Sequence, residues 1–89
     1  MKLKEDFIIH ESADGDVLLA VGEEAQRFHG IVKLNETAGF IVRQLEKDVT
    51  LEELVQALHK EYPDVLESTL ESDIKEIIDQ LDSIHAIEK

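Results

Sequence analysis

Apolar residues near the start of the chain come in short runs separated by turn residues. Phe7-Ile8-Ile9-His10 predicts a first strand, and the run from Val17 to Val21 predicts a second. Ala13-Asp14-Gly15-Asp16 lies between them, and its Asp-Gly pair is a strong hairpin-turn signal. The second run does not alternate with polar residues. It therefore indicates either a strand covered on both faces or a short helix.

A third strand is predicted over residues 28–34, after a polar connector at 23–27. Phe28, Val32 and Leu34 would fall on one face of this strand, because side chains alternate along an extended chain. Ile31 and Lys33 would fall on the other face.

Asn35 marks an abrupt change from strand to helix periodicity. Its side-chain oxygen can accept a hydrogen bond from an early helical N–H, and the positive end of the helix dipole favours Glu36. Gly39 lies inside this helix, where glycine costs on the order of 1 kcal/mol relative to alanine, so we expect close packing there. The apolar residues recur at the spacing of one helix face: Ala38, Ile41, Val42 and Leu45.

A second helix is predicted over residues 51–62. Thr50-Leu51-Glu52-Glu53 is a capping box, and Val49 and Leu54 are spaced as the accompanying hydrophobic staple. Tyr62-Pro63 ends the helix, because the residue before a proline avoids the helical conformation. Its apolar stripe is Leu51, Leu54, Val55 and Leu58.

A third helix is predicted to begin near Ser68, since Ser68-Thr69-Leu70-Glu71 is another potential capping box. At about 100° per residue, Ile78 falls to one side of the apolar stripe, with Lys75 and Asp82 just beyond it. The stripe itself is Leu70, Ile74, Ile77, Leu81 and Ile84. Residues 86–89 form a short tail.

Three short antiparallel strands followed by three helices predict an α+β fold. The layout is that of a winged helix-turn-helix, with the strands first instead of last. At 89 residues we expect a single domain over 1–89.

The charge of the chain is strongly negative and uneven. The formal net charge is −12, with eight acids against five bases in residues 1–45 and thirteen against four in residues 46–89. Such a surface repels phosphate backbones, so nucleic-acid binding is disfavoured. The acidic half either serves solubility or steers a basic partner.

The sequence also bears on where the protein works. No apolar run is long enough to cross a bilayer, so we expect no membrane partner. The start of the chain turns acidic too early for a signal peptide. The absence of cysteine fits a reducing cytoplasm.

Motifs for catalysis, metals or cofactors are missing from the sequence. The four histidines are scattered, and Asp14-Gly15-Asp16 lacks the other ligands of a calcium loop. No glycine-rich phosphate loop is present, and no serine has a base nearby in sequence. We therefore expect no catalytic residue, no metal and no cofactor.

Several short motifs occur together between residues 15 and 87. They include Gly22-Glu23, Phe28-x-Gly30, the junction Leu34-Asn35-Glu36-Thr37-Ala38, Phe40-Ile41, the helix start 49–54, Tyr62 and Asp73-Ile74. As a set they resemble the PqqD family of peptide chaperones from pyrroloquinoline quinone biosynthesis. Domains of this family also recognise the leaders of other ribosomal peptides that are modified after translation. Two positions depart from the family pattern: Val42 replaces a usual Trp, and Ala86 a frequent Gly.

The resemblance implies a non-catalytic protein that captures the leader of a precursor peptide. It implies a three-stranded sheet with three helices, in which the leader adds as an extra strand beside the third strand. The partners would be the precursor and a modifying enzyme, typically a radical S-adenosylmethionine protein. The unpaired strand edge could also serve a homodimer.

The residues expected to bind the leader come from one strand and one helix. The strand would offer its unpaired backbone groups to the guest, and the helix would line the groove beside it. They are Ile31, Val32, Lys33 and Leu34 on the strand, and Ile74, Lys75, Ile78 and Asp82 on the helix. The alternative for Ile78 is an ordinary core position.

Two other functions stay open from the residues alone. One is a winged-helix transcriptional regulator, although residues 51–62 carry Glu52, Glu53 and Glu61 against Lys60. The other is an acidic module that binds or inhibits a protein.

Overall fold

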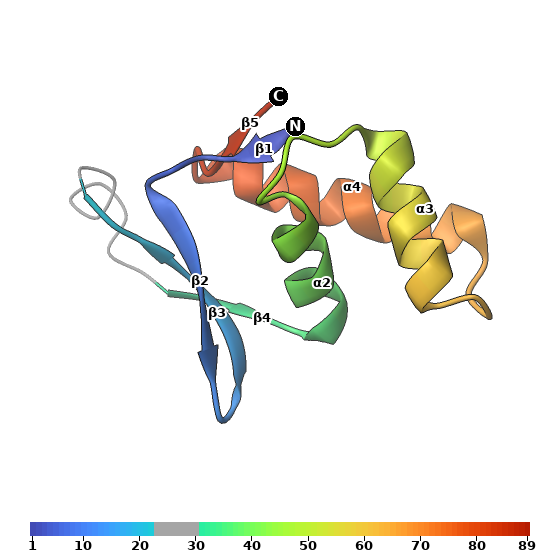
Figure 1. Ribbon diagram of the computed structural model, residues 1–89, viewed down its shortest axis with the longest axis horizontal. Helices are drawn as coiled ribbons and strands as arrows, with labels where there is room; N and C mark the ends of the chain where they lie inside the picture. Colours follow the sequence, from blue (N-terminus) through green and yellow to red (C-terminus); the bar gives the residue numbers. More distant parts are fainter. Residues whose placement is uncertain (23–30) are drawn as a thin grey trace.

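The computed structural model describes residues 1–22 and 31–89. Within them, three strands form an antiparallel sheet in the order β2-β3-β4, and three helices pack beside it (Figure 1). The strands are β2 (Phe7–Ser12), β3 (Gly15–Ala20) and β4 (Ile31–Leu34). The helices are α2 (Glu36–Gln44), α3 (Leu51–Glu61) and α4 (Glu67–Ser83). The predicted α+β fold with strands before helices is confirmed.

The hairpin of β2 and β3 follows the predicted turn. Ser12 pairs with Gly15 at the tip. Gly15 has a φ of +118°, a backbone conformation that residues with a side chain rarely adopt. The run that begins at Val17 is therefore a strand, the central one of the sheet. Leu18 is fully buried, whereas Val17 and Leu19 are only half-buried, so the strand is not covered equally on both faces.

The predicted third strand is found in part. Residues 31–34 form β4, with Val32 and Leu34 half-buried and Ile31 and Lys33 exposed, as the alternation indicates. The remainder of that prediction, residues 28–30, and the connector 23–27 lie outside the described residues.

The switch from β4 to α2 is made by Asn35. Its Oδ1 accepts a hydrogen bond of 2.8 Å from the backbone N–H of Ala38, while its own backbone stays extended. The predicted N-cap is confirmed, and the four residues of the predicted apolar face of α2 are buried in the core.

Gly39 lets α2 approach β3 closely. A Cβ at this position would lie 2.8 Å from Oδ2 of Asp16. That carboxylate is held by Arg43, whose Nη2 and Nε donate hydrogen bonds of 3.0 and 3.3 Å to it. The expected close packing at Gly39 is thus a contact between helix and sheet.

The capping box of α3 is confirmed. Thr50 Oγ1 accepts from the N–H of Glu53, and Glu53 Oε1 accepts from the N–H of Thr50, at 3.1 and 3.0 Å. The predicted capping box at Ser68 is wrong, because α4 begins one residue earlier, at Glu67, and its N-cap Leu66 has no side chain able to cap. Ser68 is an exposed residue of the first turn.

The C-terminus of α4 shows why alanine can stand at position 86, where the family often has glycine. The N–H of Ala86 donates to the carbonyl of Leu81 and the N–H of His85 donates to that of Asp82, which together form a Schellman motif. The left-handed residue of this motif is His85, with a φ of +59°. Ala86 itself is fully buried and needs no glycine conformation.

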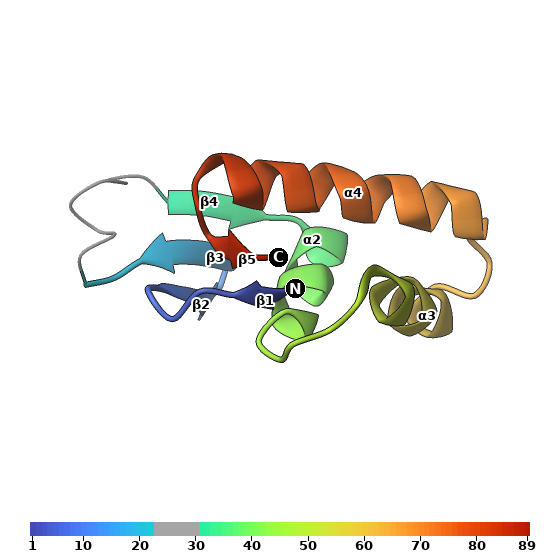
Figure 2. The ribbon, with the colours of Figure 1, turned by 90° about the horizontal axis from the view of Figure 1, so that it is seen from above.

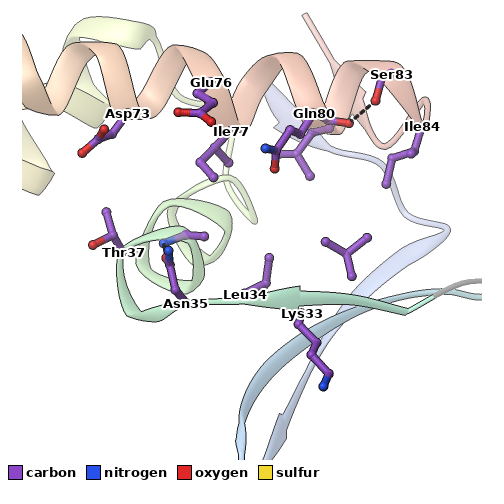
Figure 3. Close-up of a pocket in the computed structure, with 13 residues that line it drawn as sticks. Lys33, Leu34, Asn35, Thr37, Asp73, Glu76, Ile77, Gln80, Ser83 and Ile84 are labelled. Atoms are coloured by element: carbon purple, nitrogen blue, oxygen red, sulfur yellow. Dashed lines mark hydrogen bonds between the residues drawn. The ribbon is translucent and has the colours of Figure 1, made fainter.

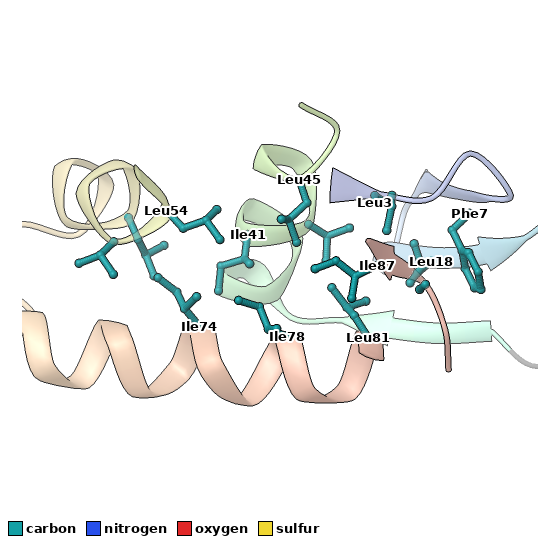
Figure 4. Close-up of a cluster of buried hydrophobic side chains, with 14 of the residues drawn as sticks. Leu3, Phe7, Leu18, Ile41, Leu45, Leu54, Ile74, Ile78, Leu81 and Ile87 are labelled. Atoms are coloured by element: carbon teal, nitrogen blue, oxygen red, sulfur yellow. The ribbon is translucent and has the colours of Figure 1, made fainter. Parts of the chain in front are cut away.

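One row of side chains on α4 organises the core. Ile74, Ile78 and Leu81 point toward α2, α3 and β5 (Figure 4), and Figure 2 shows α4 lying along the length of the molecule. The buried row of α4 is Leu70, Ile74, Ile78 and Leu81, and its main partners are Leu18, Ile41, Val42, Leu45, Leu54, Leu58 and Ile87.

Two very short strands join the ends of the described chain. β1 (Lys2–Leu3) pairs antiparallel with β5 (Ile87–Glu88), where the sequence indicates only a tail. Leu3 and Ile87 are buried, and the N–H of Leu3 donates to the carbonyl of Leu45 at 2.7 Å. Strands of two residues carry no periodicity, so the pattern of the sequence could not reveal them.

The Gly39 contact gives a testable prediction. In the natural chain, Gly39→Ala should give no stabilisation, or destabilise by up to about 1 kcal/mol, because the new methyl group displaces the Asp16 carboxylate. In an Asp16→Ala background the same change should stabilise by about 1 kcal/mol, the helix propensity difference. Urea unfolding of the four proteins measures this cycle. Equal effects in both backgrounds would show that the contact carries no energy.

The two capping boxes give a second prediction. Thr50→Ala should lower the free energy of unfolding by about 1 kcal/mol, because it removes a side-chain cap. Ser68→Ala is the matched control and should change it by no more than about 0.5 kcal/mol. A loss for Ser68→Ala as large as for Thr50→Ala would contradict the helix start described here.

Candidate functional site

Strand β4 lies at one edge of the sheet. It pairs with β3 through Val17↔Lys33 and Leu18↔Val32, and among residues 1–22 and 31–89 no strand pairs with its other side. In an antiparallel ladder, every second residue directs its N–H and C=O away from the neighbour. Two of the four residues of β4 therefore present backbone groups that a further strand could pair with. This agrees with the predicted unpaired edge.

A groove of about 470 Å³ lies between β4 and α4 (Figure 3). One wall is the strand and its junction with α2, and the other is the side of α4 that borders the core row and shares Leu81 with it. The lining residues are Val32, Lys33, Leu34, Asn35, Thr37, Ala38, Asp73, Glu76, Ile77, Gln80, Leu81, Ser83 and Ile84.

The centre of the groove is mostly apolar. Figure 3 shows Ile77 and Gln80 projecting from α4 toward Leu34. Ile84 lies at one end, and Asp73 lies at the other, near the start of α2. The side chain of Lys33 points away from α4, so its stem and backbone border the groove while its charge lies outside.

A polar brace joins α2 to the hairpin on which β4 pairs. Arg43 on α2 pairs with Asp16 at 3.0 Å and with Glu11 at 2.8 Å, which joins the helix to both strands of the hairpin. The hydrogen bond to Asp16 is the main cause that raises the pKa of Arg43 above its ordinary value. Asp16 stands opposite Leu34 in the ladder, so the brace acts at the point where β4 meets α2.

The strand residues expected to bind a peptide lie at the groove. Val32, Lys33 and Leu34 line the groove, and Ile31 belongs to the same edge strand, with its side chain on the other face from Val32 and Leu34.

The helix side differs from the expectation. Ile74 is fully buried and Ile78 nearly so, both within the core row, so neither has a free surface beside β4. Lys75 pairs with Glu71 and Asp82 with Lys89, and neither lines the groove. The expected exposed part of Ile74 is wrong, and Ile78 follows the alternative of an ordinary core position.

The site assignment missed four apolar residues that line the groove: Ala38, Ile77, Leu81 and Ile84. Ile77 and Ile84 belong to the predicted apolar stripe, and both are only half-buried. The signal was present, because the apolar face of α4 is wider than one row. The sequence alone does not show which edge of that face enters the core and which borders the groove, because this depends on the position of β4.

The described residues hold no cluster of three or more His, Cys, Asp or Glu that could bind a metal ion. Among the same residues, no helix is long and apolar enough to span a membrane. The residues that line the groove offer backbone hydrogen-bonding groups, apolar contacts and carboxylates.

Comparisons with known proteins point to one family. The model of the family described as coenzyme PQQ synthesis protein D (PqqD) matches residues 15–87. The PqqA binding protein of Acinetobacter baylyi is 35% identical over 54 residues, which cover 61% of this chain and 52% of that protein. The match thus spans about half the length of this curated relative.

Two solved structures share the fold. TbiB1 in complex with the TbiA(beta) leader peptide has a TM-score of 0.79 and 25% identity, over 99% of this chain and 95% of the other. Lasso peptide synthetase B1 complexed with the leader peptide has a TM-score of 0.72 and 27% identity, over 92% and 89%. With a family model that covers most of its length, and with the resemblance in its sequence confirmed, this protein belongs to the PqqD family.

Proposed function

We propose that this protein is a non-catalytic peptide chaperone. It captures the leader segment of a ribosomal precursor peptide by strand addition at β4 and presents the precursor to a separate modifying enzyme. The observation that carries this proposal is the unpaired edge of β4 beside an apolar groove. The PqqA binding protein and the two leader-peptide complexes support it as relatives and structural neighbours.

Strand addition suits the geometry of the edge. A guest in extended conformation would pair with the outward N–H and C=O groups of β4. Every second guest side chain would then enter the groove between β4 and α4, and the others would face away. Backbone pairing supplies affinity for any extended peptide, and the groove supplies selectivity.

The partner enzyme is proposed to be of the radical S-adenosylmethionine type, as the family implies. The protein itself contributes no catalytic group and no cofactor in this scheme, and both partners act in the cytoplasm. The same strand edge could pair with a second copy in the absence of a guest, and the leader would then compete with that dimer.

Hydrogen exchange tests strand addition directly. On saturation with a synthetic leader peptide that the protein binds, the amides of β4 that point away from β3 should gain protection. The other two amides of Ile31–Leu34 should change little, because they already pair with β3. Binding without any gain of protection in β4 would contradict strand addition.

A matched pair of substitutions on α4 tests the groove. Ile77→Gln should weaken leader binding about tenfold, because it removes an apolar contact worth on the order of 1.5 kcal/mol. Lys75→Gln lies on the same helix outside the groove and should change the Kd by less than about twofold. Calorimetric titration measures both, with circular dichroism melts to confirm that each variant folds. A larger loss for Lys75→Gln than for Ile77→Gln would favour the helix face expected from the sequence.

A further inference from the structure

The groove is charged at one end. Asp73 and Glu76 border it near Asn35 and Thr37, whereas Ile84 borders the opposite end (Figure 3). Lys33 is the one basic residue among the described residues that line it, and its ammonium group points away from α4. A guest peptide thus meets two carboxylates at one end, and beyond them Ile77, Leu81 and Ile84 together with the uncharged polar side chains of Gln80 and Ser83.

Some carboxylates of α4 are ion-paired and others are not, and of the second kind only Asp73 and Glu76 border the groove. Glu71 pairs with Lys75 at 3.1 Å, and Asp82 pairs with Lys89 at 3.3 Å. Within residues 1–22 and 31–89, neither Asp73 nor Glu76 has an ion-pair partner. A bound strand would cover them and remove part of their water, which is unfavourable unless the strand brings a cation.

The direction of the guest follows from the arrangement of β4 and α4. Along the groove, β4 runs from Lys33 to Leu34 in the direction opposite to that of α4 from Asp73 to Ile84 (Figure 3). Antiparallel strand pairs are the more common and slightly more stable kind. An antiparallel guest would therefore run from the carboxylates toward Ile84.

The spacing of the guest residues follows from helix and strand geometry. The midpoint of Asp73 and Glu76 precedes Ile84 by about 14 Å along the helix axis. A strand covers that length in about four residues, and every second one faces the groove. The guest residue opposite the carboxylates is thus followed by groove-facing positions two and four residues later.

We infer that the groove selects peptides with a basic side chain opposite Asp73 and Glu76, followed two and four residues later by apolar side chains. This inference rests on the proposed function and specifies the peptide that the groove takes. An acidic residue at the first position is repelled, so the same pair of carboxylates also rejects wrong guests.

A display library of random dodecapeptides tests the inference without knowledge of the natural leader. Selection on the natural protein should enrich Lys or Arg followed by apolar residues at the second and fourth positions after it. For the best peptide, changing that base to Glu should weaken binding about tenfold in fluorescence anisotropy, with a smaller difference at high salt.

The double variant Asp73→Asn, Glu76→Gln should lose the preference for the base and keep the apolar pattern. The control is Asp79→Asn, Glu61→Gln, which changes the net charge equally at exposed positions outside the groove and should keep the preference. This control separates the local carboxylates from the net charge of −12.

The possible outcomes separate the inference from the proposed function. Peptides with apolar alternation but no basic residue, or a basic preference that survives in the Asp73 and Glu76 variant, would overturn the inference and leave peptide capture standing. Failure to enrich any peptide, or enrichment of peptides whose binding Ile77→Gln does not weaken, would overturn both.

Discussion

The structure depends on the burial of a single row of side chains along α4. Ile74, Ile78 and Leu81 pack in one core with the other helices and the short terminal strand, so α2, α3 and β5 are positioned relative to this helix, and the sheet is joined to it through α2. A second apolar edge of the same helix, at Ile77 and Ile84, is left over because α2 and β4 do not reach far enough to cover it. The core and the groove are thus two sides of one amphipathic face that is wider than folding alone requires.

Local chemistry made much of the fold predictable from the sequence. The Asp-Gly turn, the Asn35 cap and the Thr50 capping box each act within a few residues, and the structure confirms all three. The predicted capping box at Ser68 was wrong because Ser68 lies within the exposed first turn of α4, and the N-cap position is occupied by Leu66. The pairing of β1 with β5 could not be foreseen, since it joins residues more than eighty positions apart.

The two sides of the candidate site also differed in how well the sequence predicted them. Its strand side came from the resemblance, which implies a guest beside the third strand, and among the described residues that strand does lie at the edge of the sheet. Its helix side was not predictable, because Ile77 and Ile78 are adjacent in sequence and both apolar. Only the packing of α4 decides that Ile78 enters the core and Ile77 borders the groove. The unpaired carboxylates of Asp73 and Glu76 could not be singled out from the sequence either, since an acidic helix surface is ordinary in a chain of this charge.

The brace of Arg43, Asp16 and Glu11 has a consequence for how firmly a guest is held. It ties the β2–β3 hairpin, with which β4 pairs, to α2 before anything binds, so the strand side of the groove loses little conformational freedom when the groove fills. The entropic cost of association then falls almost entirely on the incoming peptide, which must straighten from a flexible chain. That ordering cost lowers the net affinity of any flexible peptide that pairs with β4.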